Sequence, residues 1–459
     1  MSDKKNNQKN PYDMAIVNGT VIDVVQEKFV KKNIGITNGK IEKLTTEKIS
    51  GKEVIDAQGL LISPGFIDFH SHVDGNSYSA ACLVKQGGTT TLGGERELSS
   101  KSISRVEDGF VINQGFSISQ SFVLRRAVGI TNPKRPANSE EISAMVDLAR
   151  RFMEYGAFAI CFGLELVPGT SFDEILALSK VAKEYERPIM VHLRKDGKEA
   201  LQYFEEIIQV AELTGVSVQI LQLMYMVGIG GAMPMALEII EKARAKGLDI
   251  MADSGVYAAY SACIGTGIFE KGWEKEYGDT STEDLLISSG IHVGEYCNDE
   301  LFETLRSEFP ETLVTAFVCD PEAISMALKK DYVYVSTNAA DGPHYPGIGA
   351  PEVAGTYPRL LGKYVREEKV ISLMEAIKKI TILPAKRFGI RETGHIEEGM
   401  NADIVIFDEN TIIDRADFIG IGRPDTPPEG IKAVIVNGKK AVENGYLTEN
   451  ICAGRFIKR

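Results

Sequence analysis

Two histidines that stand one residue apart are the first candidates for chemistry. His70 and His72 lie in the stretch GFIDFHSH, directly after an apolar run, in a chain that has six histidines. Side chains alternate between the two faces of a β-strand, so both imidazoles are expected on one face of a strand end. Neutral imidazole is the commonest protein ligand for zinc and related metals. The spacing indicates half of a metal site; the alternative is two polar residues in an ordinary strand-to-loop transition.

Further potential ligands follow other short apolar stretches. His192 ends PIMVH, Asp341 follows YVYVST, and Glu95 follows GGTTTLGG. The carboxyl ends of parallel barrel strands meet on one face, and catalytic groups gather there. A barrel would bring these side chains together with His70 and His72, so we predict a metal site from this set.

The elements that must position these residues alternate between strand and helix. Short apolar strands are predicted at 158–162, 188–192, 216–221 and 248–253, a spacing of about 30 residues that is typical of βα units. ETLVTAFV and DYVYVST are predicted as later strands, and 254–298 as a large loop over one barrel face. The alternation predicts an α/β fold, a (β/α)8 TIM-like barrel with loop insertions. A doubly wound open sheet is the rival, but neither G-x-G-x-x-G nor a Walker A motif supports it.

The two ends of the chain are rich in short β-type segments. Two Asn-Gly steps in the first 40 residues are hairpin signals, and the end of the chain repeats the pattern in ADIVIFDENTI and IKAVIVNGKK. We predict one small β-sandwich module built from 12–63 and 395–459, attached to a barrel over 64–394. The polar residues 1–11 are expected to form a disordered tail.

Composition limits the classes of function. The net charge of −13 argues against a general surface for nucleic acid or anionic membranes. No run of about 18 apolar residues occurs, and the start MSDKKNNQKN lacks a stretch resembling a signal peptide, so a cytoplasmic location is expected. The six cysteines form no C-x-x-C pair and are expected to be buried thiols. The composite of β-module and barrel helices offers surfaces for a homo-oligomer.

Several longer motifs point to a family. GFIDFHSH, QGGTTTLGG, GAFAICFGLELVPG, HLRKDG, TGVSVQILQL, GTYPRLLGKYVRE and GHIEEGMNADIVIFD occur in this order, and the similarity extends over roughly residues 12 to 458. Together they resemble the metal-dependent amidohydrolase superfamily and, within it, the N-acyl-D-amino-acid deacylase (D-aminoacylase) family. The resemblance implies a hydrolase of carbon–nitrogen bonds other than peptide bonds, a small-molecule amide substrate, and zinc or another divalent metal as cofactor.

The same resemblance implies roles for individual residues. His70, His72 and His192 match metal ligands, and Asp341 matches an aspartate that contacts metal and shuttles the proton. Arg194, in HLRKDG, is a candidate with His192 for stabilising the developing oxyanion.

Residues of the stretch SGVYAAYSA are candidates for the wall of the substrate pocket. They match pocket residues of the family, and ordinary loop packing is the alternative. The candidates are Tyr257, Tyr260 and Ser261.

The chain departs from the family at two metal-ligand positions. Arg96 stands where the family has a bridging cysteine, and a guanidinium has no lone pair to offer a metal. Glu95 would supply an oxygen ligand if the strand end shifts by one residue, whereas an ion pair with Arg96 is the alternative. Gln222 stands at a fourth histidine, so one metal on His70, His72 and Asp341 is expected, and two metals are the alternative.

The chain also departs at the positions that would hold a substrate carboxylate. Met224 stands at a substrate-contacting lysine, and Glu352, eleven residues after Asp341, stands at a carboxylate-binding arginine. Arg96 offers a relocated positive charge. We therefore expect neutral, cyclic or cationic amides to be better substrates than N-acyl-D-amino acids. A hydrolase of hydantoin-like or lactam rings and a non-catalytic barrel relative are the alternative functions.

Overall fold

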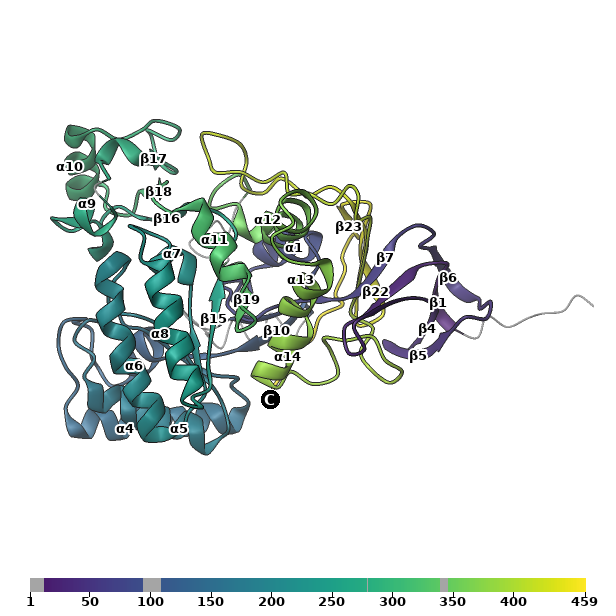
Figure 1. Ribbon diagram of the computed structural model, residues 1–459, viewed down its shortest axis with the longest axis horizontal. Helices are drawn as coiled ribbons and strands as arrows, with labels where there is room; N and C mark the ends of the chain where they lie inside the picture. Colours follow the sequence, from purple (N-terminus) through teal and green to yellow (C-terminus); the bar gives the residue numbers. More distant parts are fainter. Residues whose placement is uncertain (1–11, 94–108, 279, 339–345) are drawn as a thin grey trace, which may run out of the picture.

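The computed structural model of the chain describes residues 12–93, 109–278, 280–338 and 346–459. Figure 1 shows a central barrel, a β-module at one end that joins the first and last strands of the chain, and a smaller excursion at the other end. The predicted tail, 1–11, lies outside the described residues.

The β-module consists of two sheets with strands from both ends of the chain. One sheet has the order β5-β4-β1-β6 and the other β23-β22-β21-β20-β7-β2-β3. The strands of the first are β1 (Tyr12–Val17), β4 (Asn33–Thr37), β5 (Lys40–Thr45) and β6 (Gly51–Asp56). Those of the second are β2 (Thr20–Asp23), β3 (Lys28–Lys31), β7 (Leu61–Pro64), β20 (Ile404–Phe407), β21 (Ile431–Val436), β22 (Lys439–Glu443) and β23 (Tyr446–Leu447). Antiparallel pairing of β20 with β7 joins the two ends, and buried isoleucines from both ends form the core between the sheets.

Parallel strands form the barrel. In order around it they are β8 (Phe66–Asp68), β9 (Gly88–Gly93), β10 (Asn113–Phe116) continued by β11 (Ile118–Ser119), β12 (Ile160–Gly163), β13 (Ile189–His192), β14 (Val218–Ile220), β15 (Ile250–Ser254) and β19 (Val333–Val335). The ring closes between β19 and β8, where the backbone N–H of Asn338 donates to the carbonyl of His70 over 3.1 Å. The hydroxyl of Thr337 also donates to the carboxylate of Asp68 there.

The alternation of side chains along the strands decides which residues reach the barrel interior. In β13, Ile189 and Val191 belong to the large apolar core shared with the outer helices, whereas Met190 belongs to a separate cluster within the barrel. His192 follows Met190 by two residues and therefore lies on the same inner face, at the carboxyl end of the strand. The strand period thus places the imidazole toward the mouth of the barrel.

Helices cover the outside of the barrel. Contacts link α4, α5, α6, α8 and α11 in chain order, and Figure 1 shows α4, α5, α6 and α8 side by side. The outer helices are α1 (Ser77–Lys85), α4 (Ser139–Tyr155), α5 (Phe172–Glu184), α6 (Ala200–Thr214), α8 (Met233–Ala245), α11 (Pro321–Leu328), α13 (Leu373–Lys379) and α14 (Ile382–Phe388). Local sequence fixes their ends: a capping box of Asn138 and Glu141 starts α4, and Gly215, with φ of 66°, ends α6.

Two details differ from the sequence prediction. The segment 254–298, expected as a loop, is largely folded, and ETLVTAFV is not a barrel strand. It forms β18 (Leu313–Ala316), which pairs antiparallel with β16 (Tyr260–Cys263) and β17 (Leu285–Ile287) in the excursion. The excursion also holds α9 (Trp273–Glu276) and α10 (Asp299–Glu308). Apolar content predicts a strand but not the sheet that it joins, which explains the error.

Two further expectations concern the cysteines and membranes. All six cysteines are free thiols and most are buried, but Cys452 is exposed, contrary to the prediction. Among the described residues, no helix is both long and apolar enough to cross a bilayer.

Candidate metal centre

A cavity of about 390 Å³ opens at the carboxyl ends of the barrel strands. Its volume is in the range of small-molecule sites. The structure brings three predicted ligands, His70, His72 and His192, to the wall of this one cavity. Ser261 and Gln222, from the predicted pocket and ligand positions, line it as well.

A buried carboxylate that sequence reasoning missed orients His70. Asp253, at the end of β15, is fully buried, and its Oδ1 lies 3.3 Å from Nδ1 of His70. The same oxygen accepts the backbone N–H of Gln222 and the hydroxyl of Ser336, each over 3.0 Å. A carboxylate at Nδ1 is the usual partner of a metal-binding histidine, because it fixes the tautomer and leaves Nε2 as the ligand atom. The signal in the sequence was the last residue of the predicted strand LDIMAD.

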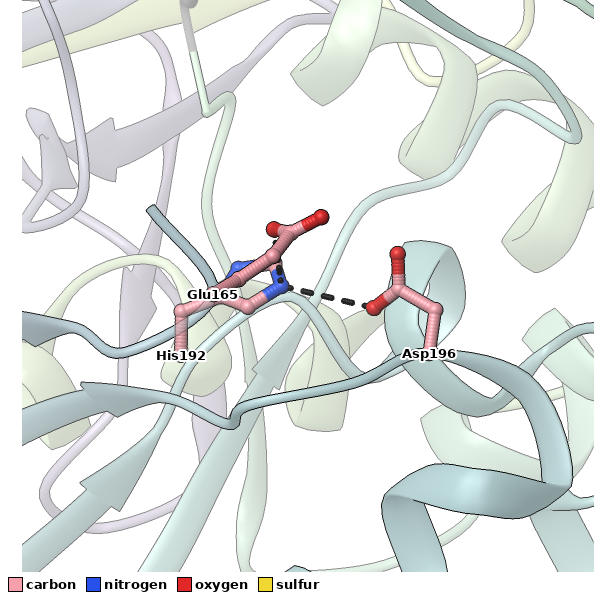
Figure 2. A group of neighbouring side chains, drawn as sticks. All are labelled: Glu165, His192 and Asp196. Carbon is pink, nitrogen blue, oxygen red and sulfur yellow. Dashed lines mark hydrogen bonds and ion pairs between the residues drawn. The ribbon is translucent and has the colours of Figure 1, made fainter. Parts of the chain in front are cut away.

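His192 has a different environment. Its Nε2 lies 3.2 Å from Oε2 of Glu165 and 3.4 Å from Oδ1 of Asp196, as Figure 2 shows. The hydroxyl of Tyr277 donates to the other oxygen of Asp196 over 2.8 Å. Glu165 and Asp196 line the cavity and were missed as site residues, although both stand in motifs that were singled out, GLELVPG and HLRKDG.

Arg194 does not occupy the predicted position beside the reaction centre. Its Nε and Nη2 donate to the two carboxylate oxygens of Glu206, each over 2.8 Å, and Nη2 also donates to the carbonyl of Thr170. Glu206 belongs to α6, so the guanidinium points from the strand end toward an outer helix and does not line the cavity. The geometry therefore argues against the expected role in oxyanion stabilisation.

Glu352 lies behind the cavity wall and not on it. The side chain is buried at the start of α12 (Glu352–Arg359), where its Oε1 accepts the hydroxyl of Tyr225 over 3.1 Å. Burial raises the pKa of Glu352 to about 7. Tyr225, rather than Glu352, lines the cavity, so the expected direct contact of Glu352 with substrate is not seen.

Of the stretch SGVYAAYSA, Ser261 and Ala262 are found at the cavity among the described side chains. Tyr257 donates to Asp414 over 3.1 Å, and the guanidinium of Arg359 lies 4.4 Å from its ring centre. Tyr257 therefore packs structurally, as the alternative prediction had it. Ser261 lines the cavity and shares a 2.8 Å hydrogen bond with the hydroxyl of Thr315.

Four predicted site residues belong wholly or partly to the part of the chain that the structure does not describe. Glu95, Arg96 and Asp341 belong to segments that the structure does not describe, and for Tyr260 only the backbone, in β16, is described. Their roles stay predictions.

The described lining of the cavity carries more negative than positive side chains. Three carboxylates are present, those of Glu165, Asp196 and Glu311, and none of the described lining residues is lysine or arginine. Met224, at the expected lysine position, is fully buried in the apolar core. Imidazoles and carboxylates together are a donor set that suits a divalent metal.

Comparison with known proteins agrees with this architecture. Residues 344–442 match the model of the Amidohydrolase family. The chain is 25% identical to the D-aminoacylase of Alcaligenes xylosoxydans xylosoxydans over 98% of both chains. A solved D-aminoacylase, studied for the functional role of its binuclear metal center, superposes with a TM-score of 0.86 at 25% identity over 98% of this chain and 100% of its own. The N-acyl-D-glutamate deacylase from Bordetella bronchiseptica, complexed with zinc and a phosphonate inhibitor, shares the fold at 22% identity, with a TM-score of 0.85 over 98% of this chain and 100% of its own.

These similarities confirm the predicted TIM barrel with a β-sandwich and the predicted resemblance to D-aminoacylases. Together with the match of residues 344–442 to the Amidohydrolase family model, these relatives indicate a hydrolase that acts on carbon–nitrogen bonds other than peptide bonds.

The contact between Asp253 and His70 gives a first prediction. Asp253→Asn keeps the size of the side chain but removes the charge behind His70, so the apparent affinity for Zn²⁺ should fall about 10- to 100-fold. Competition with a chromophoric chelator measures this affinity. Ser336→Ala, which removes a neighbouring hydrogen bond to the same carboxylate and leaves His70 untouched, is the control and should change it less. Unchanged affinity in a folded Asp253→Asn protein would contradict the orienting role.

Proposed function

We propose that the protein is a zinc-dependent amidohydrolase whose preferred substrates are neutral, cyclic or cationic amides. The observation that carries the proposal is the cavity itself, where histidines at barrel strand ends meet a lining of carboxylates. The histidines support the metal, and the carboxylates support the choice of substrate.

His70, His72 and Asp341 are the residues proposed to hold one zinc ion. When bound, zinc supplies Lewis acidity, which polarises a carbonyl and lowers the pKa of water. Asp341 follows Asn338, a residue of the cavity wall, by three positions in the chain. In the proposed reaction its carboxylate takes a proton from the attacking water and delivers it to the leaving nitrogen, as a general base and then a general acid.

His192 is the remaining candidate for stabilising charge that develops on the substrate oxygen. It lines the cavity together with Glu165 and Asp196, the carboxylates that it contacts, whereas Arg194 does not line the cavity. A donor that faces the reacting atoms stabilises developing negative charge because it is oriented in advance.

The substrate preference follows from charge. A substrate carboxylate entering the cavity would approach Glu165, Asp196 and Glu311, and like charges placed together in a site cost several kcal/mol. Neither Met224 nor Glu352 supplies a compensating cation, since a thioether and a carboxyl group carry no positive charge, and both lie behind the cavity wall. Arg96 is the one proposed residue that would reverse this preference.

Removal of the two strand-end histidines tests the metal assignment. The double variant His70→Asn, His72→Asn should lose the stoichiometric zinc measured by elemental analysis, because both imidazole ligands are gone. His395→Asn, which removes an imidazole paired with Glu397 in the β-module, is the matched control and should keep it. Full zinc content in the double variant would show that the ligands are assigned wrongly.

The proton shuttle is tested by Asp341→Asn. Turnover should fall by at least about 100-fold, the low end for general acid–base catalysis, since an amide cannot accept the proton from water. Asp331→Asn changes an exposed carboxylate ahead of β19 and should leave turnover near that of the unmodified protein. A near-normal rate in Asp341→Asn would remove this residue from the mechanism.

A substrate panel tests the preference. N-acetyl-D-methionine and N-acetyl-D-methioninamide differ only in a carboxylate against a neutral carboxamide, so the amide should be hydrolysed faster. N-acetyl-D-glutamate, hydantoins, lactams and N-acylated amines extend the panel. Hydrolysis of the anionic substrates with kcat/KM above about 10⁴ M⁻¹s⁻¹ would refute the preference and point to Arg96 as the carboxylate partner. Absence of any turnover by a zinc-loaded protein would favour the non-catalytic alternative.

A further inference from the structure

Three side chains on the cavity wall converge on one point. Glu165 follows β12, His192 ends β13, and Asp196 immediately precedes the short helix η2 (Gly197–Glu199). One potential ligand atom from each lies within 4.8 Å of the others. Figure 2 shows both carboxylates turned toward the same edge of the imidazole ring. We call these three residues the carboxylate–histidine cluster.

The two separations from His192 are close to those between neighbouring ligands on a metal ion. Nε2 of His192 lies 3.2 Å from Oε2 of Glu165 and 3.4 Å from Oδ1 of Asp196. Zinc binds nitrogen and oxygen at about 2.0–2.1 Å with tetrahedral geometry, which puts neighbouring ligand atoms about 3.3–3.4 Å apart. Since the three atoms all lie within 4.8 Å of one another, side-chain adjustment can bring them to the same ion.

The surroundings of Asp196 hold it in a suitable orientation. Its Oδ2 accepts the hydroxyl of Tyr277, a buried residue of the excursion, over 2.8 Å. Because that oxygen is engaged, Oδ1 is the one turned toward His192. Metal-binding carboxylates are commonly held in this way by a neighbouring hydrogen-bond donor.

The chemistry of the cluster distinguishes it from a group of acidic residues on a surface. It includes an imidazole from the inner face of a barrel strand, and its members are mostly buried, with side-chain exposures of 19% for Glu165, 16% for His192 and 8% for Asp196. One nitrogen and two carboxylate oxygens suit Zn²⁺, Mn²⁺ or Co²⁺. The cavity beside them leaves room for water or substrate to complete the coordination.

We infer that Glu165, His192 and Asp196 bind a second divalent cation in the cavity, in addition to the ion proposed at His70 and His72. The inference rests on the proposed function only for the first ion, and it replaces the role proposed above for His192, because a nitrogen bound to a metal cannot also donate to the substrate oxygen. With this ion bound, the charges of Glu165 and Asp196 would be compensated, and Glu311 would be the described carboxylate of the cavity that still opposes an anionic substrate.

The test uses the full-length protein stripped of metal and titrated with Co²⁺. The number of bound ions is measured by elemental analysis after desalting, and the visible absorption of Co²⁺ reports its ligands. The unmodified protein should bind two ions. In Glu165→Gln, Asp196→Asn the affinity for one of the two should fall at least about 10- to 100-fold. Glu311→Gln, which removes a carboxylate of the same cavity outside the cluster, should still bind two.

A ligand exchange guards against loss of folding in the double variant. Glu165→His replaces an oxygen ligand by nitrogen at the same position, so it should keep two ions and change the Co²⁺ spectrum of one of them. Melting temperatures with and without metal show whether each variant is folded. Identical spectra and affinities for Glu165→His and the unmodified protein would overturn the inference.

Comparison with His70→Asn, His72→Asn separates this inference from the proposed function. Binding of a single ion that only the histidine variant loses would overturn the inference and leave the proposed function intact. A single ion that depends on Glu165 and Asp196 but not on His70 and His72 would support the inference and contradict the proposed ligands. Loss of one ion in each variant would support both, and absence of any bound ion in the unmodified protein would overturn both.

Discussion

The carboxylate of Asp253 is the contact on which the geometry of the cavity depends most. It joins the ends of separate barrel strands, since it binds His70 after β8, the backbone of Gln222 after β14 and Ser336 after β19. A fully buried carboxylate is stable only if hydrogen bonds replace its water. The partners that meet this requirement are the residues that form the mouth of the barrel. The cost of burying one charge thus fixes the relative positions of strand ends that are far apart in the sequence.

The excursion between β15 and β19 completes the cavity from outside. Ser261 of β16 lines the cavity, and its hydroxyl is hydrogen-bonded to that of Thr315 in β18. The hydroxyl of Tyr277, also in the excursion, donates to Asp196. Barrel enzymes build their sites from the segments that follow the strands, while the strands themselves supply rigid positions. In this protein the rigid part supplies the imidazoles, and the excursion supplies groups that set their surroundings. Substitutions in the excursion are therefore expected to change the substrate specificity more than the barrel fold.

The spacing of the apolar runs and the sequence motifs were sufficient to predict the barrel and the metal-site histidines His70 and His72. Short apolar runs predicted most barrel strands, and the same-face rule placed His70 and His72 together. The strand formed by β10 and β11 was missed because NQGFSIS is polar and contains glycine, although it is buried in the sheet. Asp253 and Asp196 stand in segments that the sequence singled out, but their roles were missed, since those roles depend on partners such as His70 and Tyr277 that other parts of the chain bring in. The positions of Arg194 and Glu352 had the same cause: Glu206, in the following helix, and Tyr225, 127 residues away from Glu352, bind them in directions that residue spacing does not encode.

The carboxylates of the site contact different ring nitrogens of two histidines, His70 and His192. Asp253 contacts Nδ1 of His70, so it faces the barrel and leaves Nε2 for the cavity. Glu165 and Asp196 contact Nε2 of His192, which is the nitrogen that a metal would use. A carboxylate behind the ring strengthens its basicity and fixes its direction, whereas a carboxylate in front must either accept the ring proton or share the metal. A cation bound in the cluster would occupy the nitrogen that the two carboxylates contact, so the same three side chains would be linked through the ion and no longer directly to one another.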